Sequence, residues 1–376
     1  MARLRLKERI ARKNRALAFL QLRTAAALHS QMWFWAHVGF IHTLGRLALD
    51  DTPTHLPTRD IFEFLSAQDC VNFLRFTRSQ IILMMELLCV PDRIRTECGY
   101  VLSGRTALCI LLYRMAFPCR YKDMRVIFHL PDSLLCEAFN YMLHFVDETW
   151  GPLLTLDIGR LVPQLEVFVE ALQAWGCPLP NCWAFIDGTV RAICRPKRNQ
   201  RAYFNGHKRF HAIKFQAIVT PDGMVVDLFG PELGTRHDVH LLNQSGVLLT
   251  LAEHINSSSG DPYIMYGDPA YGMSTHLNCP YSAETYGPLT AGMMEFNKNM
   301  SACRVTVEWV FKEMTSKWAF VSMKNQQKYL LSPVGVQYKV ATLLSNIHSC
   351  LNGGNEISQY FGCPPPSLEE YLGVAV

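Results

Sequence analysis

The sequence predicts an α/β protein in which an all-α N-terminal part precedes a mixed sheet flanked by helices. Two observations predict this class. Up to about position 175, apolar residues recur at the i, i+3, i+4 spacing of helices, whereas from position 182 short apolar and β-branched runs alternate with turns rich in Gly, Pro and Asp. The segment WGCPLPNC at 175–182 separates the two patterns, so we place a domain boundary there.

Length and composition indicate a folded protein with room for two domains. The chain has 376 residues, of which 49% are hydrophobic and 18% charged. Its 13 cysteines are an odd number spread along the chain, and no signal-peptide core is visible, which together predict a reducing, intracellular environment. The most apolar stretch, Met32–Leu49, is interrupted by His37 and Arg46, so we expect a buried helix there and no membrane partner.

These patterns divide the chain into four regions. We expect a basic arm and helical region at 1–97, a helical domain at 98–175, the α/β domain at 182–352 and a C-terminal tail at 353–376.

In the helical domain, apolar spacing predicts helices over Arg105–Ala116, Lys122–Leu130 and Leu135–Val146. Three helices joined by tight turns resemble a helix-turn-helix unit, in which the last helix lies in the DNA major groove. Plain helical bundles contain the same arrangement, so both interpretations stay open.

Strands and helices then alternate in the α/β domain. We expect strands over Cys182–Asp187, His211–Thr220, Met224–Phe229 and Tyr263–Tyr266. Pro221-Asp222-Gly223 has the composition of a hairpin turn between the second and third strands. Helical periodicity predicts one helix over Asp238–Leu251 and another from about Ser301 to Trp318. The predicted order is three strands, helix, strand, helix.

Two acids stand at the expected ends of strands. Asp187 closes the strand in AFIDGT, where Gly188 would let the backbone turn away, and Asp268 follows the strand in YIMYGDPAYG. Two carboxylates at the ends of neighbouring strands repel each other unless a cation lies between them. The pair therefore predicts bound Mg²⁺ or Mn²⁺, hard cations that prefer oxygen ligands.

Glu308 is the candidate for a third carboxylate. It lies at the edge of the apolar stripe of the late helix, from where it could reach a metal held by the strands. Three carboxylates and two metal ions would catalyse phosphoryl transfer without a covalent nucleophile. Each acid also has a plainer interpretation: Asp before Gly or Pro is common in turns, and Arg304, Glu308 and Lys312 have the spacing of a surface ion-pair ladder.

Taken together, the second half of the chain resembles the DDE superfamily endonuclease domain of PIF/Harbinger-type DNA transposases. The matching pieces are FIDGT, GHKRFHAIKFQAIVTPDGMVVDLFGPELGTRHD, the GDPAYG loop and FNKNMSACRVTVEWVFKEM. The resemblance covers roughly Ala184–Leu351 and, more faintly, Tyr100–Val146, where the family places its helix-turn-helix. The sequence departs from the family at Leu289–Gly292, where a Thr-Pro-Tyr-like segment is common, and directly after Asp268.

The resemblance implies a fold, a reaction and partners. The fold would be RNase H-like, and the catalytic, metal-holding triad of the family falls on Asp187, Asp268 and Glu308. The implied function is metal-dependent cleavage of DNA in cut-and-paste transposition, together with a separate Myb-like protein for DNA targeting and nuclear entry. We accordingly expect localisation in the nucleus, with the cytoplasm as the alternative, and consider a homo-oligomer.

Basic residues accumulate beside the first acid, and no acidic residue occurs between Asp187 and Asp222. The candidate DNA contacts are Arg195, Lys197, Arg198, Arg201, Lys208, Arg209, Lys214 and, on the late helix, Arg304. Tyr203 and Phe204 lie among them and could stack on bases, while a solvated hairpin is the alternative. The basic run Met1–Arg15 fits a solvated arm, a mitochondrial presequence, or a nucleic-acid or nuclear-import segment.

Asp238 and two histidines, His207 and His211, are further candidates for roles near the site. Asp238 is expected to be the N-cap of its helix, and an auxiliary contact to the site is the alternative, because the family has an Asp there too. His207 and His211 lack a Cys at zinc spacing, so we expect packing or phosphate contacts.

The alternative functions are a domesticated DNA-binding or scaffold protein without catalysis, and a ribonuclease or repair nuclease on the same fold.

Overall fold

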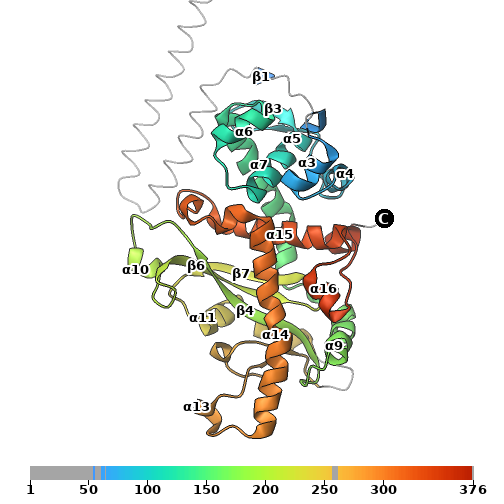
Figure 1. Cartoon of the computed structure of the whole chain (residues 1–376), viewed down its shortest axis with the longest axis vertical. Helices are drawn as coiled ribbons and strands as arrows, with labels where there is room; N and C mark the ends of the chain where they lie inside the picture. Colours follow the sequence, from blue (N-terminus) through green and yellow to red (C-terminus); the bar gives the residue numbers. More distant parts are fainter. Residues whose placement is uncertain (1–53, 56–60, 64, 256–260, 375–376) are drawn as a thin grey trace, which may run out of the picture.

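The structure is a computed structural model that describes residues 54–55, 61–63, 65–255 and 261–374 (Figure 1). The basic arm Met1–Arg15 and the predicted buried helix Met32–Leu49 lie outside the described residues. Within the described part of the chain, no helix is long and apolar enough to cross a membrane.

The elements of the N-terminal half are β1 (Thr54–His55), η1 (Ile61–Glu63), α3 (Ala67–Asp69), η2 (Cys70–Leu74), α4 (Arg78–Leu87), β2 (Arg93–Arg95), β3 (Tyr100–Ser103), α5 (Gly104–Ala116), α6 (Tyr121–Phe128), α7 (Asp132–Trp150), η3 (Gly151–Leu154), α8 (Ile158–Leu161), η4 (Val162–Gln164) and α9 (Leu165–Ala174). The elements of the C-terminal half are β4 (Cys182–Ala192), α10 (Gln200–Tyr203), β5 (Phe204–Asn205), β6 (Phe210–Val219), β7 (Val225–Leu233), α11 (Asp238–Ser245), α12 (Val247–His254), β8 (Ile264–Tyr266), η5 (Pro269–Tyr271), β9 (Leu277–Asn278), α13 (Ala283–Tyr286), α14 (Ala291–Lys317), η6 (Ala319–Ser322), η7 (Lys324–Gln326), α15 (Val334–Leu351), α16 (Glu356–Phe361) and α17 (Leu368–Leu372).

The N-terminal part is a group of helices around α5 with a small sheet beside it. Almost every residue of α5 is buried, because α4, α7 and the strands pack against its apolar side chains. β3 pairs in parallel with β1 and antiparallel with β2, and the cross-strand partners Ile94 and Leu102 are both buried. The prediction of an all-α N-terminal part is wrong in this respect, because such short strands give too little periodicity to be recognised.

The three predicted helices of the helical domain are confirmed as α5, α6 and α7. The last of them, α7, buries Leu135, Phe139, Met142 and neighbouring apolar residues against the core. Its sequence, DSLLCEAFNYMLHFVDETW, contains four acidic residues and neither Lys nor Arg. Because DNA is polyanionic, these charges disfavour α7 as a helix that enters the major groove.

The C-terminal half is built on a mixed sheet in the order β7–β6–β4–β8–β9, with β5 at the end of β6. β6 runs antiparallel to β4 and β7, whereas β8 and β9 run parallel to β4 and β8, respectively. If β5 is left out and the strands are numbered in order along the chain, their order from one edge of the sheet to the other is third, second, first, fourth and fifth. The four predicted strands are confirmed. The structure adds β9, whose two residues carry no recognisable pattern.

Helices cover the sheet, and two of the predicted ones differ in length. α14 begins at Ala291, about ten residues before the predicted start, and runs along the sheet from the region of α13 toward the N-terminal part (Figure 1). The helix expected over Asp238–Leu251 is interrupted at Gly246, whose φ of 69° is left-handed, and therefore forms α11 and α12.

The C-terminal segment packs on the domain, although we expected a tail at 353–376. The apolar side chains of Ile357, Phe361, Leu368 and Tyr371 in α16 and α17 are buried, and the Trp175 ring stacks on Tyr360 with 4.0 Å between the centroids. Buried side chains from both halves of the described chain form one continuous hydrophobic cluster. The predicted boundary at 175–182 therefore separates two patterns of secondary structure that share one core.

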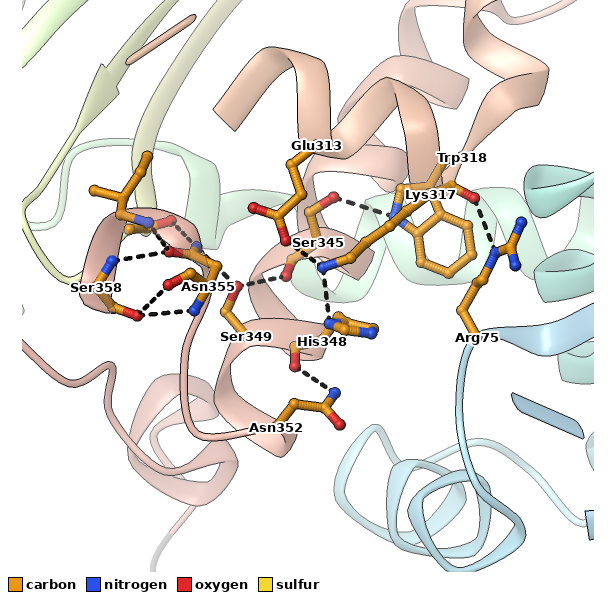
Figure 2. A network of polar contacts seen from close by, with 12 residues as sticks. Arg75, Glu313, Lys317, Trp318, Ser345, His348, Ser349, Asn352, Asn355 and Ser358 are labelled. Atoms are coloured by element: carbon orange, nitrogen blue, oxygen red, sulfur yellow. Dashed lines mark hydrogen bonds and ion pairs between the residues drawn. The ribbon is translucent and has the colours of Figure 1, made fainter. Parts of the chain in front are cut away.

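Polar contacts join the end of α14 to α15 and to the N-terminal part (Figure 2). The Lys317 Nζ forms an ion pair with Glu313 and lies 3.0 Å from the Nδ1 of His348. Burial, Lys317 and Arg75 lower the pKa of His348 to about 4, so its ring is neutral and accepts the hydrogen bond from Lys317. Arg75 in turn donates from Nε to the Lys317 carbonyl at 3.4 Å. These contacts hold the C-terminal end of α14 in place.

Candidate active site

Asp187 lies inside β4 and not at its end. The strand continues to Ala192, and Asp187 pairs with Ala217 of β6. The expectation that Gly188 turns the backbone away is therefore wrong. On the other side of β4, the pairing with β8 extends only as far as Phe185 and Tyr266. Beyond that point, β4 lies beside the chain that leaves β8.

Asp268 lies directly after β8, as the sequence predicts. It is the N-cap of η5, and its Oδ1 accepts a hydrogen bond from the Ala270 N–H at 2.9 Å. Because β8 is parallel to β4 and ends opposite Phe185, the chain that leaves β8 carries Asp268 alongside the part of β4 that holds Asp187. The sheet topology therefore brings together two of the three predicted acids.

The charges of these acids act on each other. Burial is the main cause that raises the pKa of Asp187 to about 6; Asp268 and Asp238 also raise it, while Arg304 and the Gly188 N–H lower it. Burial likewise raises the pKa of Asp268, followed by Asp238, against the lowering effects of the Ala270 N–H, Arg304 and Lys214. Raised carboxyl pKa values in a partly buried acidic group are typical of functional sites.

Two cations neutralise part of this charge. Arg304 of α14 places Nη1 3.8 Å from Oδ1 of Asp187, and Lys214 of β6 places Nζ 2.7 Å from Oδ1 of Asp238. Lys214 is only 7% exposed and also donates to the Arg236 carbonyl at 3.3 Å. Both residues were predicted as DNA contacts, which stays a prediction; in the structure their charges are directed at carboxylates of the protein itself.

Asp238 is the first residue of α11, and the N-cap is His237, so the predicted capping role is wrong. Its carboxylate lies over Gly188 of β4, where a Cβ would come 2.2 Å from Asp238 Oδ1. Gly188 is therefore required for the close approach of Asp238. Because neighbouring residues of a strand point to opposite faces, Arg304 and Asp238 approach this part of β4 from opposite sides.

Glu308 is exposed on α14, and it is not among the charges that act on Asp187 or Asp268. Among the described residues, no group of three or more His, Cys, Asp or Glu side chains is close enough to hold a metal ion. Asp238, and not Glu308, is thus the further acid whose charge acts on Asp187 and Asp268. In donor chemistry, Asp187 and Asp268 fit a hard divalent cation, because both are partly buried carboxylates.

One protein family matches part of the chain. Residues 186–346 match the family model of the DDE superfamily endonuclease. The matched region begins one residue before Asp187, includes Asp268 and Glu308, and ends within α15. No curated protein and no solved structure matches the chain.

The predicted basic residues beside this endonuclease-type region are mostly accessible. Six of them, which we call the basic segment, are exposed: Arg195, Lys197, Arg198, Arg201, Lys208 and Arg209. Phe204 is 43% exposed, whereas Tyr203 is buried against Tyr329, with 5.2 Å between the ring centroids, and is not free to stack on a base. His207 is exposed, and the ring of His211 packs against Phe204 with 5.4 Å between the ring centroids.

Sequence reasoning missed Lys324, which joins the basic segment from η7. Burial, Arg195 and Lys324 together lower the pKa of His211, so both cations lie near that ring. The Cys194 N–H also donates to the Gln327 carbonyl at 2.9 Å, which ties the two segments together. No local pattern could indicate this contact, because the residues are more than 100 positions apart.

Proposed function

We propose that this protein is a metal-dependent DNA endonuclease of the transposase type, and that PIF/Harbinger transposases are its subtype. It would cut phosphodiester bonds of DNA, with strand transfer as the accompanying reaction. The observation that carries the proposal is the approach of Asp187 in β4 and Asp268 directly after β8, inside the region that matches the DDE superfamily endonuclease. The strand order, third–second–first–fourth–fifth, supports an RNase H-like fold for this region.

Asp187 and Asp268 are the residues that would hold the cation. Bound Mg²⁺ or Mn²⁺, as a pair of ions in the two-metal arrangement, would supply Lewis acidity for the attacking and leaving oxygens. Arg304 would leave Asp187 when a cation arrives, because the guanidinium and the cation compete for the same carboxylate. Glu308 lies one helical turn beyond Arg304, on the same side of α14, and is the proposed third ligand.

DNA would lie along the basic segment beside the acids. These six exposed cations, with Lys324, would contact phosphates. Three further proposals follow if DNA is the substrate. The protein would be located in the nucleus, a Myb-like accessory protein would target it to DNA, and a homo-oligomeric assembly would hold two DNA ends.

Cleavage of supercoiled plasmid in Mg²⁺ or Mn²⁺ tests the proposal. We expect metal-dependent strand breaks by the wild type, and their loss in Asp187→Asn, Asp268→Asn and Glu308→Gln with DNA binding retained. Asp227→Asn is the matched control: Asp227 is a buried acid of β7 whose Oδ1 accepts from the Leu156 N–H at 3.1 Å, a bond that an amide oxygen preserves. Full cleavage by all three acid variants would contradict the assigned site.

A second candidate function is a DNA-binding protein that has kept the fold without catalysis. The pairing of Arg304 with Asp187, together with the exposed position of Glu308, favours it, because an arginine on the first acid substitutes for a cation. DNA binding by a wild type that makes no strand breaks in either metal would establish this candidate over the first.

A further inference from the structure

The turn between η7 and α15 exposes two adjacent leucines to solvent. Leu331 is 81% exposed, which makes it the most exposed large apolar residue among those that the structure describes, and Leu330 is 63% exposed. Single exposed apolar side chains are common on protein surfaces, whereas adjacent ones gathered at one place indicate a contact surface. We call Leu330 and Leu331 the apolar tip.

Hydrogen bonds fix the shape of this turn. Leu331 and Ser332 donate their N–H groups to the Lys328 carbonyl at 2.9 and 3.0 Å, and the Ser332 hydroxyl donates to the same oxygen at 3.2 Å. Leu330 has a φ of 72°, in the left-handed region that residues with a Cβ rarely adopt. Such strain persists only where the surrounding structure holds it, and it concentrates at binding sites. The apolar tip is therefore held outward in one conformation.

The base of the turn is attached to the chain that carries the basic segment. Cys194 donates its N–H to the Gln327 carbonyl at 2.9 Å and its thiol to the Lys324 carbonyl at 3.0 Å. The Tyr329 ring packs on Tyr203 of α10, with 5.2 Å between the centroids. In Figure 1, α10 and the turn before α15 accordingly lie on the same side of the molecule. The apolar tip and the basic segment thus belong to one surface.

The charges around the apolar tip favour a polyanionic partner. Lys324 and Lys328 precede it and are exposed, and they add to the six cations of the basic segment. Glu232 is the nearby acid, and its charge acts on Tyr329. Duplex DNA has phosphates outside and stacked apolar base faces inside, which fits a cationic surface with an apolar projection. The turn also lies within residues 186–346, which match the endonuclease family.

We propose that Leu330 and Leu331 form a wedge that enters between two base pairs of duplex DNA and unstacks them. The proposal rests on the proposed function, because it presupposes that DNA lies along the basic segment. Lys324 and Lys328 would contact the phosphates beside the opened step. Unstacking costs less where a base pair is already mismatched, so a wedge gives the protein a preference for mismatched duplex over fully paired duplex.

Binding to two duplexes of equal length tests this in EDTA, where no cleavage occurs. One duplex is fully paired, and the other has one central mismatch with 2-aminopurine beside it. We expect the wild type to bind the mismatched duplex about tenfold more tightly and to raise the 2-aminopurine fluorescence, which reports unstacking. Leu330→Asn with Leu331→Asn should lose both effects, and asparagine tolerates the left-handed backbone of the turn. Leu249→Asn on α12, where the leucine is 72% exposed, is the matched control and should behave like the wild type.

The outcomes separate the wedge from the proposed function. Changing Arg195, Lys197 and Arg198 to Gln should weaken binding to both duplexes and keep the preference. A wild type that binds DNA without the preference, or a double Asn variant that retains it, would overturn the wedge and leave the proposed function standing. A preference that depends on the two leucines in a protein that makes no strand breaks would keep the wedge and overturn the nuclease. A wild type that does not bind DNA would overturn both.

Other occupants of the apolar tip give different results. A second copy of the chain would make the wild type self-associate, and an anionic membrane would make it bind vesicles that contain phosphatidylserine. Loss of either property in the double Asn variant, with an unchanged preference for mismatched duplex, would assign the tip to that occupant and overturn the wedge.

Discussion

At the scale of single residues, the motif at Asp187 and Gly188 locates an acid that the structure brings near Asp268, but the structural role expected for the glycine was wrong. A strand followed by Asp-Gly predicts a strand end and a projecting carboxylate, yet β4 continues past both residues. The glycine is needed because Asp238 occupies the space of its side chain. That requirement comes from a helix about 50 positions later, so no local reading of FIDGT could have found it.

The acids themselves were predictable because each follows or ends an apolar run. Asp187 and Asp268 were identified in this way, and the structure brings them together. The Lys214–Asp238 pair was not, because a lysine within a basic segment looks like a DNA contact until the sheet places it beside α11. The pairing of Arg304 could not be predicted either: on an isolated helix Arg304 would pair with Glu308, but the packed helix places it beside Asp187.

The raised pKa of Asp187 predicts how cation binding depends on pH. With a pKa of about 6, the carboxyl is mostly protonated at pH 5 and ionised at pH 7.5, and a cation binds only the ionised form. Mn²⁺ affinity should therefore rise about tenfold between pH 5 and pH 7 and then level off. Titrations with Mn²⁺ at several pH values measure this. An affinity that does not change from pH 5 to pH 8 would contradict the assigned pKa or its role.

At the scale of elements, long periodic segments were predicted well and short or interrupted ones were not. The four main strands and the helices α5, α6 and α7 follow from their apolar spacing. The first ten residues of α14, AGMMEFNKNM, were missed although Met293, Phe296 and Met300 recur at helical spacing, because most of the segment is polar or exposed. The strands β1, β2, β3 and β9 have two to four residues each, too few for a period to show.

The basic segment yields a prediction at this scale. Changing Arg195, Lys197 and Arg198 to Gln should weaken binding to duplex DNA and lower the slope of log affinity against log salt by up to about 3, at roughly 0.9 per lost phosphate contact. Filter binding or fluorescence anisotropy over a salt series measures the slope.

The matched control changes Lys298 and Lys312, two exposed lysines of α14, to Gln. This variant should keep the slope of the wild type if the basic segment is the DNA track. Equal slopes in the two variants and the wild type would instead make the segment a solvated hairpin. The helix-turn-helix-like unit is not expected to dominate DNA binding, because its last helix, α7, is acidic.

At the scale of the whole molecule, the sequence predicted two halves of different texture, but not that they share a core. The polar contacts around Lys317 and His348 join the end of α14 to α15 and the N-terminal part (Figure 2). The hydrophobic cluster likewise continues across the predicted boundary. Such long-range packing depends on which faces meet in three dimensions, and periodicity along one segment does not specify its partner.

The C-terminal helices give a test at this scale. Deleting residues 353–376 removes the buried side chains of Ile357, Phe361, Leu368, Tyr371 and Leu372, each worth roughly 1.5–3 kcal/mol. Their sum is comparable with the roughly 5–15 kcal/mol that stabilises a whole protein, so the shortened chain should not fold. Circular dichroism and thermal melting measure this, with deletion of residues 374–376 alone as the neutral control. A cooperative melt like that of the wild type would contradict the packing described.

The central claim is that Asp187 and Asp268 hold a divalent cation where β8 ends beside β4, and metal-directed cleavage of the protein tests it most directly. Fe²⁺ bound in place of Mg²⁺, with ascorbate and peroxide, cuts the polypeptide close to the metal, and mass spectrometry locates the cuts. The account predicts cuts near Asp187 and Asp268 that excess Mg²⁺ suppresses and Asp268→Asn abolishes. Cuts elsewhere in the chain, or cuts at these positions that persist in Asp268→Asn, would contradict it.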